Sequence, residues 1–142
     1  MLRTARIGDR RRRVDASAIV ELLLRTETGR AVGRRLVGEE LHAPAHLDAE
    51  VVGALRRAVI GTRITREEAD EAVAVLNDLP IQRWDLAPLS VAALDHLRSL
   101  TVADAYYVVL ALALNTGMVT CDGPLSRAHG HDAAIELIGP SN

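Results

Sequence analysis

Four acidic residues stand at places where a folded chain would gather them. Asp15 follows Val14, and Asp122 follows the short apolar segment 118–121, so each stands at the position where a strand would end. Asp104 stands near the start of a segment with helical periodicity, and Glu50 lies within another such segment, beside aliphatic residues. Ligand sites in parallel α/β sheets lie beyond the carboxyl ends of the strands, so we expect these carboxylates to converge there.

A cluster of carboxylates predicts a particular chemistry. Like charges repel, and a hard divalent cation is the usual means of neutralising them. Mg²⁺ and Mn²⁺ prefer oxygen ligands, and such an ion polarises a phosphodiester and activates water. The candidate reaction is therefore metal-assisted hydrolysis of a phosphodiester. Asp15, Asp104 and Asp122 would hold the ion or ions. Glu50 would hold a metal directly or through water and help to orient the attacking water.

Each of these residues also has a purely structural interpretation. Asp15 could cap the helix that follows it, and Asp104, three residues after Thr101, could belong to a capping box. Asp122 precedes a Gly-Pro pair and could form a turn, while Glu50 could be a solvated helix residue. None of the four is specific alone, but the four together give a stronger signal for a site.

Alternating strands and helices must position these side chains. Apolar periodicity, caps and Gly/Pro breaks predict strands over 13–16, 41–44, 81–86, 118–121 and 134–138. The same signals predict helices from about residue 17 and over 30–38, 46–60, 65–79, 90–100 and 101–114, of which 65–79 opens with a capping box. This alternation indicates an α/β fold with a mainly parallel sheet.

Composition excludes several mechanisms. The chain has 142 residues, is 49% hydrophobic and carries a net charge of −2, which suits one compact domain. All of its 17 basic residues are arginine, which excludes lysine Schiff-base chemistry and a P-loop lysine. The 2% aromatic content argues against RNA binding by exposed stacked rings. The single cysteine excludes a disulfide framework and cysteine-based zinc sites.

The N-terminal segment is rich in arginine and has no strand or helix pattern before residue 13. We expect a basic extension over 1–12 and a single domain over 13–142. The run of arginines at 10–13 is costly in a central strand, so the strand must be very short or the guanidinium groups must reach solvent or carboxylates. The longest apolar run, 106–114, is too short to cross a bilayer, so we expect a cytoplasmic protein with no membrane contact.

Four short motifs follow one another along the chain. They are VDASA at 14–18, Glu50-Val51 within a helix, LTVADAYY at 100–107, and TCD at 120–122 with Leu125 nearby. In this order they resemble the motifs of PIN-domain nucleases, most closely the VapC-type toxins of bacterial type II toxin–antitoxin pairs. The resemblance covers about residues 14–138.

The resemblance implies a PIN-like, doubly wound, mainly parallel sheet flanked by helices. It implies an endoribonuclease that depends on Mg²⁺ or Mn²⁺ and cuts structured RNA such as tRNA or rRNA. It also implies a cognate antitoxin protein as partner, and a homodimer. The acidic quartet of the family corresponds to Asp15, Glu50, Asp104 and Asp122, with Ser17 and Thr120 at the small hydroxyl positions beside it. Asp48, two residues from Glu50, would lie on a different helix face.

Two rival interpretations come from other functional classes. A phosphoryl-transfer enzyme with Asp15 as nucleophile would need a second Asp two residues later and a Lys, but position 17 is Ser and the chain has no Lys. A non-catalytic PIN-like module that binds RNA or protein would keep the fold without the chemistry. Retention of the whole acidic quartet argues against that module, and a metal-binding titration would separate the two.

Overall fold

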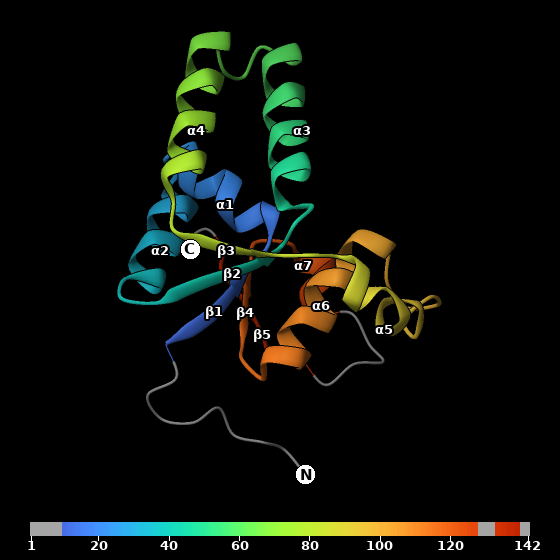
Figure 1. Ribbon diagram of the computed structural model, residues 1–142. Helices are drawn as coiled ribbons and strands as arrows, with labels where there is room; N and C mark the ends of the chain where they lie inside the picture. The colour runs from blue at the N-terminus through green and yellow to red at the C-terminus, as the bar shows by residue number, and fades with distance from the viewer. Residues whose placement is uncertain (1–9, 128–132, 140–142) are drawn as a thin grey trace.

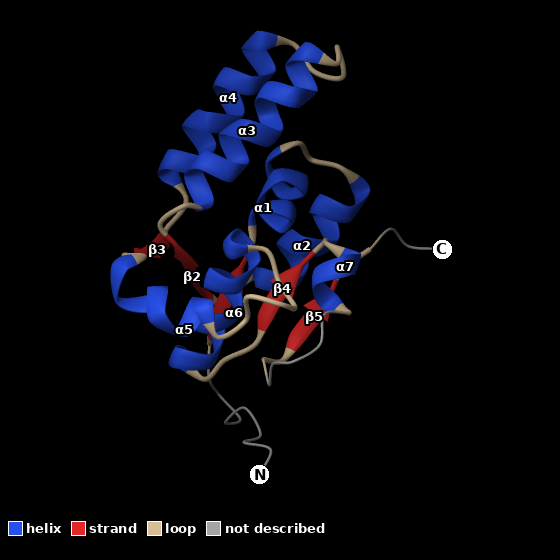
Figure 2. Ribbon diagram, turned by 90° about the vertical axis from the view of Figure 1, so that its right-hand side faces the viewer, coloured by secondary structure: helices blue, strands red, loops and turns tan. Residues whose placement is uncertain are grey.

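The computed structural model describes residues 10–127 and 133–139, which form a parallel sheet with helices on both faces (Figure 1 and Figure 2). The five strands lie in the order β3-β2-β1-β4-β5, and every neighbouring pair is parallel. They are β1 (Arg11–Val14), β2 (Glu40–Pro44), β3 (Ile81–Trp84), β4 (Met118–Thr120) and β5 (Ile135–Leu137). The predicted parallel α/β fold is confirmed.

Strand β1 is the centre of this sheet, and its place defines a crevice. The chain continues from β1 to β2 and β3 on one side, while β4 and β5 lie on the other. The strand order therefore reverses between β1 and β4. In doubly wound sheets ligands bind outside the carboxyl ends of the strands at such a reversal. Asp15 directly follows β1, and Asp122 lies two residues after β4.

The helices form two layers and a projecting hairpin (Figure 1). On one face α1 (Ala16–Leu23) packs against α2 (Glu27–Leu36), and on the other α5 (Ser90–Leu94) packs against α6 (Val102–Leu114). Helices α3 (Leu47–Ile60) and α4 (Arg66–Asp78) pair and extend away from the sheet (Figure 2). The 3₁₀ turn η1 (Ala87–Leu89) precedes α5, and α7 (Gly123–Ser126) follows β4. Within the described ranges no helix is long and apolar enough to cross a membrane.

Local sequence signals set several of these boundaries. The predicted capping box of α4 is present: the Glu68 amide donates to Thr65 Oγ1 at 3.1 Å, and the Thr65 amide donates to Glu68 Oε2 at 2.8 Å. Helix α6 ends where Asn115 adopts a left-handed conformation. The core beneath the helices is mainly aliphatic, and Tyr107 is the large ring within it.

Several predicted elements were wrong in extent. The helix expected over 90–100 stops at Leu94, because Leu94 and Leu97 stay exposed and give residues 95–100 little apolar support. The strand expected over 13–16 lies earlier, over Arg11–Val14, because Asp15 caps α1 and ends the extended segment. The segment after Asp122, for which a turn was the structural alternative, forms the short helix α7.

The arginine run enters the sheet in an unexpected way. We expected either a very short strand or guanidinium groups that reach solvent or carboxylates. Strand β1 is indeed short, and Arg12 Nε lies 3.5 Å from the carboxylate oxygen Oε1 of Glu39. Arg13 does not reach solvent, because its whole side chain is buried. Arg11 and Arg12 pair with β2, so the sheet begins within the segment predicted as an extension. Residues 1–9 of that segment lie outside the described residues.

Candidate active site

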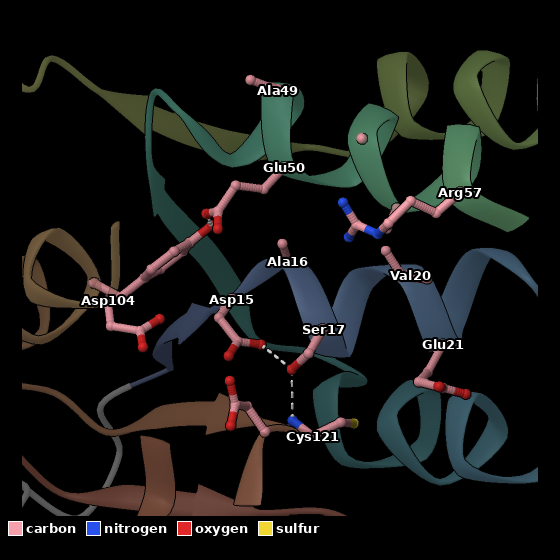
Figure 3. Close-up of a pocket in the computed structure, with 14 residues that line it drawn as sticks. Asp15, Ala16, Ser17, Val20, Glu21, Ala49, Glu50, Arg57, Asp104 and Cys121 are labelled. Atoms are coloured by element: carbon pink, nitrogen blue, oxygen red, sulfur yellow. Dashed lines mark hydrogen bonds between the residues drawn. The ribbon is translucent and has the colours of Figure 1, made fainter. Parts of the chain in front are cut away.

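A pocket of about 470 Å³ opens at the carboxyl ends of β1 and β4 (Figure 3). Helices α1, α3 and α6 contribute its walls, and small residues such as Ala16 and Ala49 leave it open. The structure brings all the predicted carboxylates into this one pocket, from separate parts of the chain. They are Asp15, Glu50, Asp104 and Asp122; Ser17 also lines the pocket, and Thr120 lies buried beside it.

Asp15 is the most tightly held of the carboxylates. It caps α1: its Oδ1 accepts the Ala18 amide at 3.0 Å and the Ser17 hydroxyl at 2.7 Å. Its Oδ2 accepts the hydroxyl of Thr120. The side chain is 4% exposed. The capping interpretation of Asp15 therefore holds together with its place in the pocket, and the carboxylate has little freedom to rotate.

The hydroxyl groups of Ser17 and Thr120 connect Asp15 to the loop after β4. Ser17 Oγ accepts the Cys121 amide at 2.9 Å, and Thr120 Oγ1 accepts the Asp122 amide at 2.9 Å. Each hydroxyl also donates to Asp15, so each bridges β1 and β4. Asp122 in turn caps α7, since its Oδ1 accepts the Leu125 amide at 3.0 Å. These bonds fix the relative positions of Asp15 and Asp122.

The electrostatics of the pocket favour an added positive charge. Burial raises the pKa of Asp15 above its usual range, even though its hydrogen bonds act in the opposite direction, and the Asp122 charge raises it further. Burial also raises the pKa of Asp104, and the negative charges of Asp122 and Glu50 add to that effect. Two carboxyl groups of the cluster are thus held in an environment that disfavours their ionised form.

Glu50 is held by Tyr107 and lies beside His46, whose Nε2 atom is also 3.0 Å from the Ala103 carbonyl oxygen. The hydroxyl of Tyr107 donates to Glu50 Oε1 at 2.7 Å, and His46 Nε2 lies 3.2 Å from the same oxygen. Tyr107 is buried, and burial together with the Glu50 charge raises the pKa of its hydroxyl, so it remains a donor. His46 also contacts the Tyr107 ring, with 4.8 Å between ring centroids. The Glu50 carboxylate is therefore oriented rather than freely solvated.

Sequence spacing could have identified some of these neighbours. His46 and Arg57 stand four residues before and seven residues after Glu50, which is one face of a helix. Arg57 lines the pocket. Asp48 lies on another face, as its spacing predicted, and forms a paired contact with Arg83 at 2.6 and 2.8 Å. That guanidinium lowers the pKa of Asp48, so this acid already has its counter-ion.

The donor set of the pocket fits a hydrated Mg²⁺ or Mn²⁺ ion. All four candidate ligands are carboxylates, which suit hard cations better than zinc or copper. In the described residues, no three acidic, histidine or cysteine side chains are close enough to form a complete chelating group. Mg²⁺ commonly takes one or two carboxylates and keeps several waters, so it does not require such a group.

The raised pKa values of Asp15 and Asp104 predict how stability depends on pH in metal-free protein. A carboxyl group with a raised pKa binds its proton more tightly in the folded state than in the unfolded state. The free energy of unfolding should therefore fall as the pH rises from the usual carboxyl pKa of 3.8 through the raised folded values. Urea unfolding in EDTA across this range measures the effect. Asp15→Asn should flatten the fall, and an equally steep fall in that variant would contradict this assignment.

Comparisons with known proteins place this chain in a class. The model of the PIN domain family matches residues 13–130. Ribonuclease VapC12 of Mycobacterium tuberculosis is 49% identical over 125 residues, which cover 88% of this chain and 97% of that relative. The chain therefore belongs to the PIN-domain family. Within that family it is a VapC-type toxin, as its motifs indicated.

Solved structures agree on the fold at much lower sequence identity. VapBC2 from Rickettsia felis, bound to a DNA fragment from its promoter, has a TM-score of 0.65 at 12% identity and covers 91% of this chain and 99% of that chain. VapC20 of Mycobacterium tuberculosis, a toxin that cleaves the sarcin–ricin loop, has a TM-score of 0.61 at 17% identity, over 81% and 92% of the two chains. The predicted PIN-like architecture is confirmed.

Proposed function

We propose that this chain is the endoribonuclease toxin of a type II toxin–antitoxin pair and hydrolyses phosphodiester bonds in structured RNA, such as tRNA or rRNA. The observation that carries the proposal is the convergence of Asp15, Glu50, Asp104 and Asp122 in one pocket at the reversal of the strand order. Known proteins add support, because the relative VapC12 is a ribonuclease and the structurally similar VapC20 cleaves the sarcin–ricin loop.

The residues of the pocket divide the work. Asp15, Asp104 and Asp122 would hold Mg²⁺ or Mn²⁺, with Glu50 as a further ligand directly or through water. The ion, when bound, supplies positive charge for the phosphodiester and for the oxygen that leaves. Ser17 and Thr120 keep Asp15 in one orientation by donating both hydroxyl hydrogens to it. Tyr107 holds the Glu50 carboxylate at the pocket, where it can orient the attacking water.

RNA cleavage with and without metal tests the proposal. Purified protein incubated with total cellular RNA should cut it at a small number of sites in Mg²⁺ or Mn²⁺, and EDTA should stop the reaction. Mapping of the new 5′ ends would identify the RNA that is cut. RNA that remains intact in both metals, with folded protein and no antitoxin present, would contradict the proposed function.

Metal binding should be visible without any substrate. An ion that binds only the folded state stabilises it by mass action, about 2.7 kcal/mol at a hundredfold excess over Kd. We therefore expect MgCl₂ or MnCl₂ to raise the melting temperature of the wild type at neutral pH. Asp104→Asn should remove most of this rise, whereas Asp70→Asn, an exposed acid on α4, should keep it. Equal rises in both variants would argue against a metal at the pocket.

An antitoxin partner is proposed from the VapBC2 structure and from the surface of the α3–α4 hairpin. Val52, Ile60 and Val75 lie exposed on this hairpin, and exposed aliphatic groups of this kind favour a protein partner. Co-expression with a small protein encoded beside this gene, followed by purification of the complex and a cleavage assay, tests this partner. The complex should be inactive.

A homodimer is proposed from a second exposed aliphatic group. Val91, Leu94, Leu97 and Val102 lie on and after α5, with exposed fractions of 64–80%. Side chains of this size in solvent favour association with a second copy. Sedimentation velocity should give a dimer mass, and a monomer at all concentrations would contradict this part of the proposal.

A further inference from the structure

One basic side chain lines the acidic pocket. Arg57 stands on α3 seven residues after Glu50, and both line the same cavity. Figure 3 shows its guanidinium extending from α3 into the pocket, on the side away from Asp104. The predicted carboxylates therefore form one end of the pocket, and Arg57 lies toward the other end, where Glu21 of α1 also lines it.

The guanidinium of Arg57 passes beside Gly53 on α3. A Cβ atom built at Gly53 would lie 3.6 Å from Arg57 Nη1, which is an ordinary contact distance, so the arginine head lies close to this small residue without depending on it. Ala49 and Ala54, on the same stretch of α3, also present small side chains to the pocket. This wall of the pocket is consequently open to a large ligand.

The acceptors for Arg57 are not supplied by the described part of the chain. Within residues 10–127 and 133–139, ion pairs to carboxylates engage Arg12, Arg35, Arg66 and Arg83. No such pair is found for Arg57 in these ranges, although it lines a pocket that holds Glu50. A guanidinium presents a planar fork that matches the oxygens of a phosphate.

We infer that Arg57 binds a phosphate of the RNA backbone next to the phosphodiester that is cut. The inference rests on the proposed function, since it takes the end of the pocket with the predicted carboxylates as the place of cleavage. With one phosphate at the carboxylates, the strand must continue out of the pocket, and the wall at Gly53 and Arg57 is open to it. Arg57 would then contribute to substrate binding and register, and not to the chemical step.

Replacing Arg57 by Ala should weaken RNA binding roughly tenfold, the usual scale for one charge-assisted hydrogen-bonding group. The matched control is Arg56→Ala, which removes the same charge from the next residue of α3, outside this pocket. Affinity for a fluorescein-labelled RNA hairpin can be measured by anisotropy in MgCl₂, with each change made together with Asp104→Asn so that the RNA stays intact. Arg57→Lys keeps the charge without the fork and should give an intermediate affinity.

Salt dependence and kinetics distinguish a contact between Arg57 and an RNA phosphate from a change in the structure of the protein. Loss of one phosphate contact should reduce the slope of log K against log salt by roughly 0.7–0.9 in Arg57→Ala and leave it unchanged in Arg56→Ala. In the active protein, KM should rise in Arg57→Ala with kcat nearly unchanged.

The possible outcomes distinguish this inference from the proposed function. Equal affinities and slopes for the two Ala variants would overturn the role of Arg57, even if the wild type cuts RNA. A fall in kcat at constant KM would also overturn it. A wild type that binds the hairpin through Arg57 but never cuts RNA would contradict only the nuclease proposal. A wild type that neither binds nor cuts would overturn both.

Discussion

Replacing Asp104 by Asn should reduce RNA cleavage by a factor on the order of 10³ while leaving the fold intact. Loss of a carboxylate that holds a catalytic ion removes several kcal/mol of transition-state stabilisation. The fold should survive because the Asp104 backbone amide still donates to Thr101 Oγ1, at 3.2 Å, and caps α6. Removal of the charge also relieves the effect of burial, and of repulsion from Asp122 and Glu50, which together raise the pKa of Asp104.

A matched control shows whether the loss comes from the pocket. Asp48→Asn makes the same chemical change two residues from Glu50, on a face of α3 that turns to Arg83 and away from the pocket. We expect this variant to keep cleavage within a few-fold of the wild type, with a modest loss of stability from the broken, partly exposed ion pair. Initial rates on a mapped RNA substrate, with circular dichroism and melting curves for each variant, measure both effects. Full activity of Asp104→Asn would contradict a mechanism in which the pocket carboxylates hold the catalytic metal ion.

Replacing Gly29 by Ala should destabilise the protein by about 3 kcal/mol, the upper end of the range for overpacking. Gly29 lies where α2 crosses the end of α1, and a Cβ atom there would lie 1.8 Å from the Glu21 carbonyl oxygen. The obstacle is backbone and cannot rotate aside, so the two helices must separate. The Thr26 hydroxyl accepts the Gly29 amide at 2.9 Å and donates to the Glu21 carbonyl oxygen, so it links the start of α2 to α1 at the same place. Chemical denaturation measures the loss.

Gly33→Ala provides the control within the same helix. A Cβ atom at Gly33 would lie 3.3 Å from the Cδ1 atom of Leu22, a flexible side-chain tip that can move. The gain in helix propensity, about 1 kcal/mol at most, should offset this small shift. We expect Gly33→Ala to unfold within about 1 kcal/mol of the wild type. If Gly29→Ala were as stable as Gly33→Ala, the close contact of α1 and α2 would not exist as described.

Several features could be predicted because they depend on short stretches of chain. Periodicity and caps indicated most helices, including the Thr65 capping box of α4. The alternation of strands and helices predicted a parallel sheet, and a parallel sheet brings Asp15 and Asp122 to one edge whatever the details of packing. Motif order then indicated Glu50 and Asp104 as companions. These signals need only backbone spacing and the common direction of neighbouring strands.

Other features depend on which surfaces meet, which a single sequence does not state. Tyr107 donates to Glu50 across 57 positions of the chain, and only the packing of α6 beside α3 creates that bond. Arg57 differs little from Arg56 in sequence, yet one lines the pocket and the other does not. Arg13 is buried although removing a guanidinium from water is costly. It lies in the central strand, paired with β2 on one side and β4 on the other, and this pairing holds its side chain beneath the helices that cover the sheet.

The four carboxylates separate what the sequence determines from what the tertiary structure determines. Their types, order and places at strand ends and on helices were set by the sequence, since local backbone geometry and chain order suffice for these. Their orientation was decided by tertiary contacts: Ser17 and Thr120 fix Asp15, and Tyr107 fixes Glu50. Hydrogen bonds act over about 3 Å, so they form only after the helices and strands have packed to that precision.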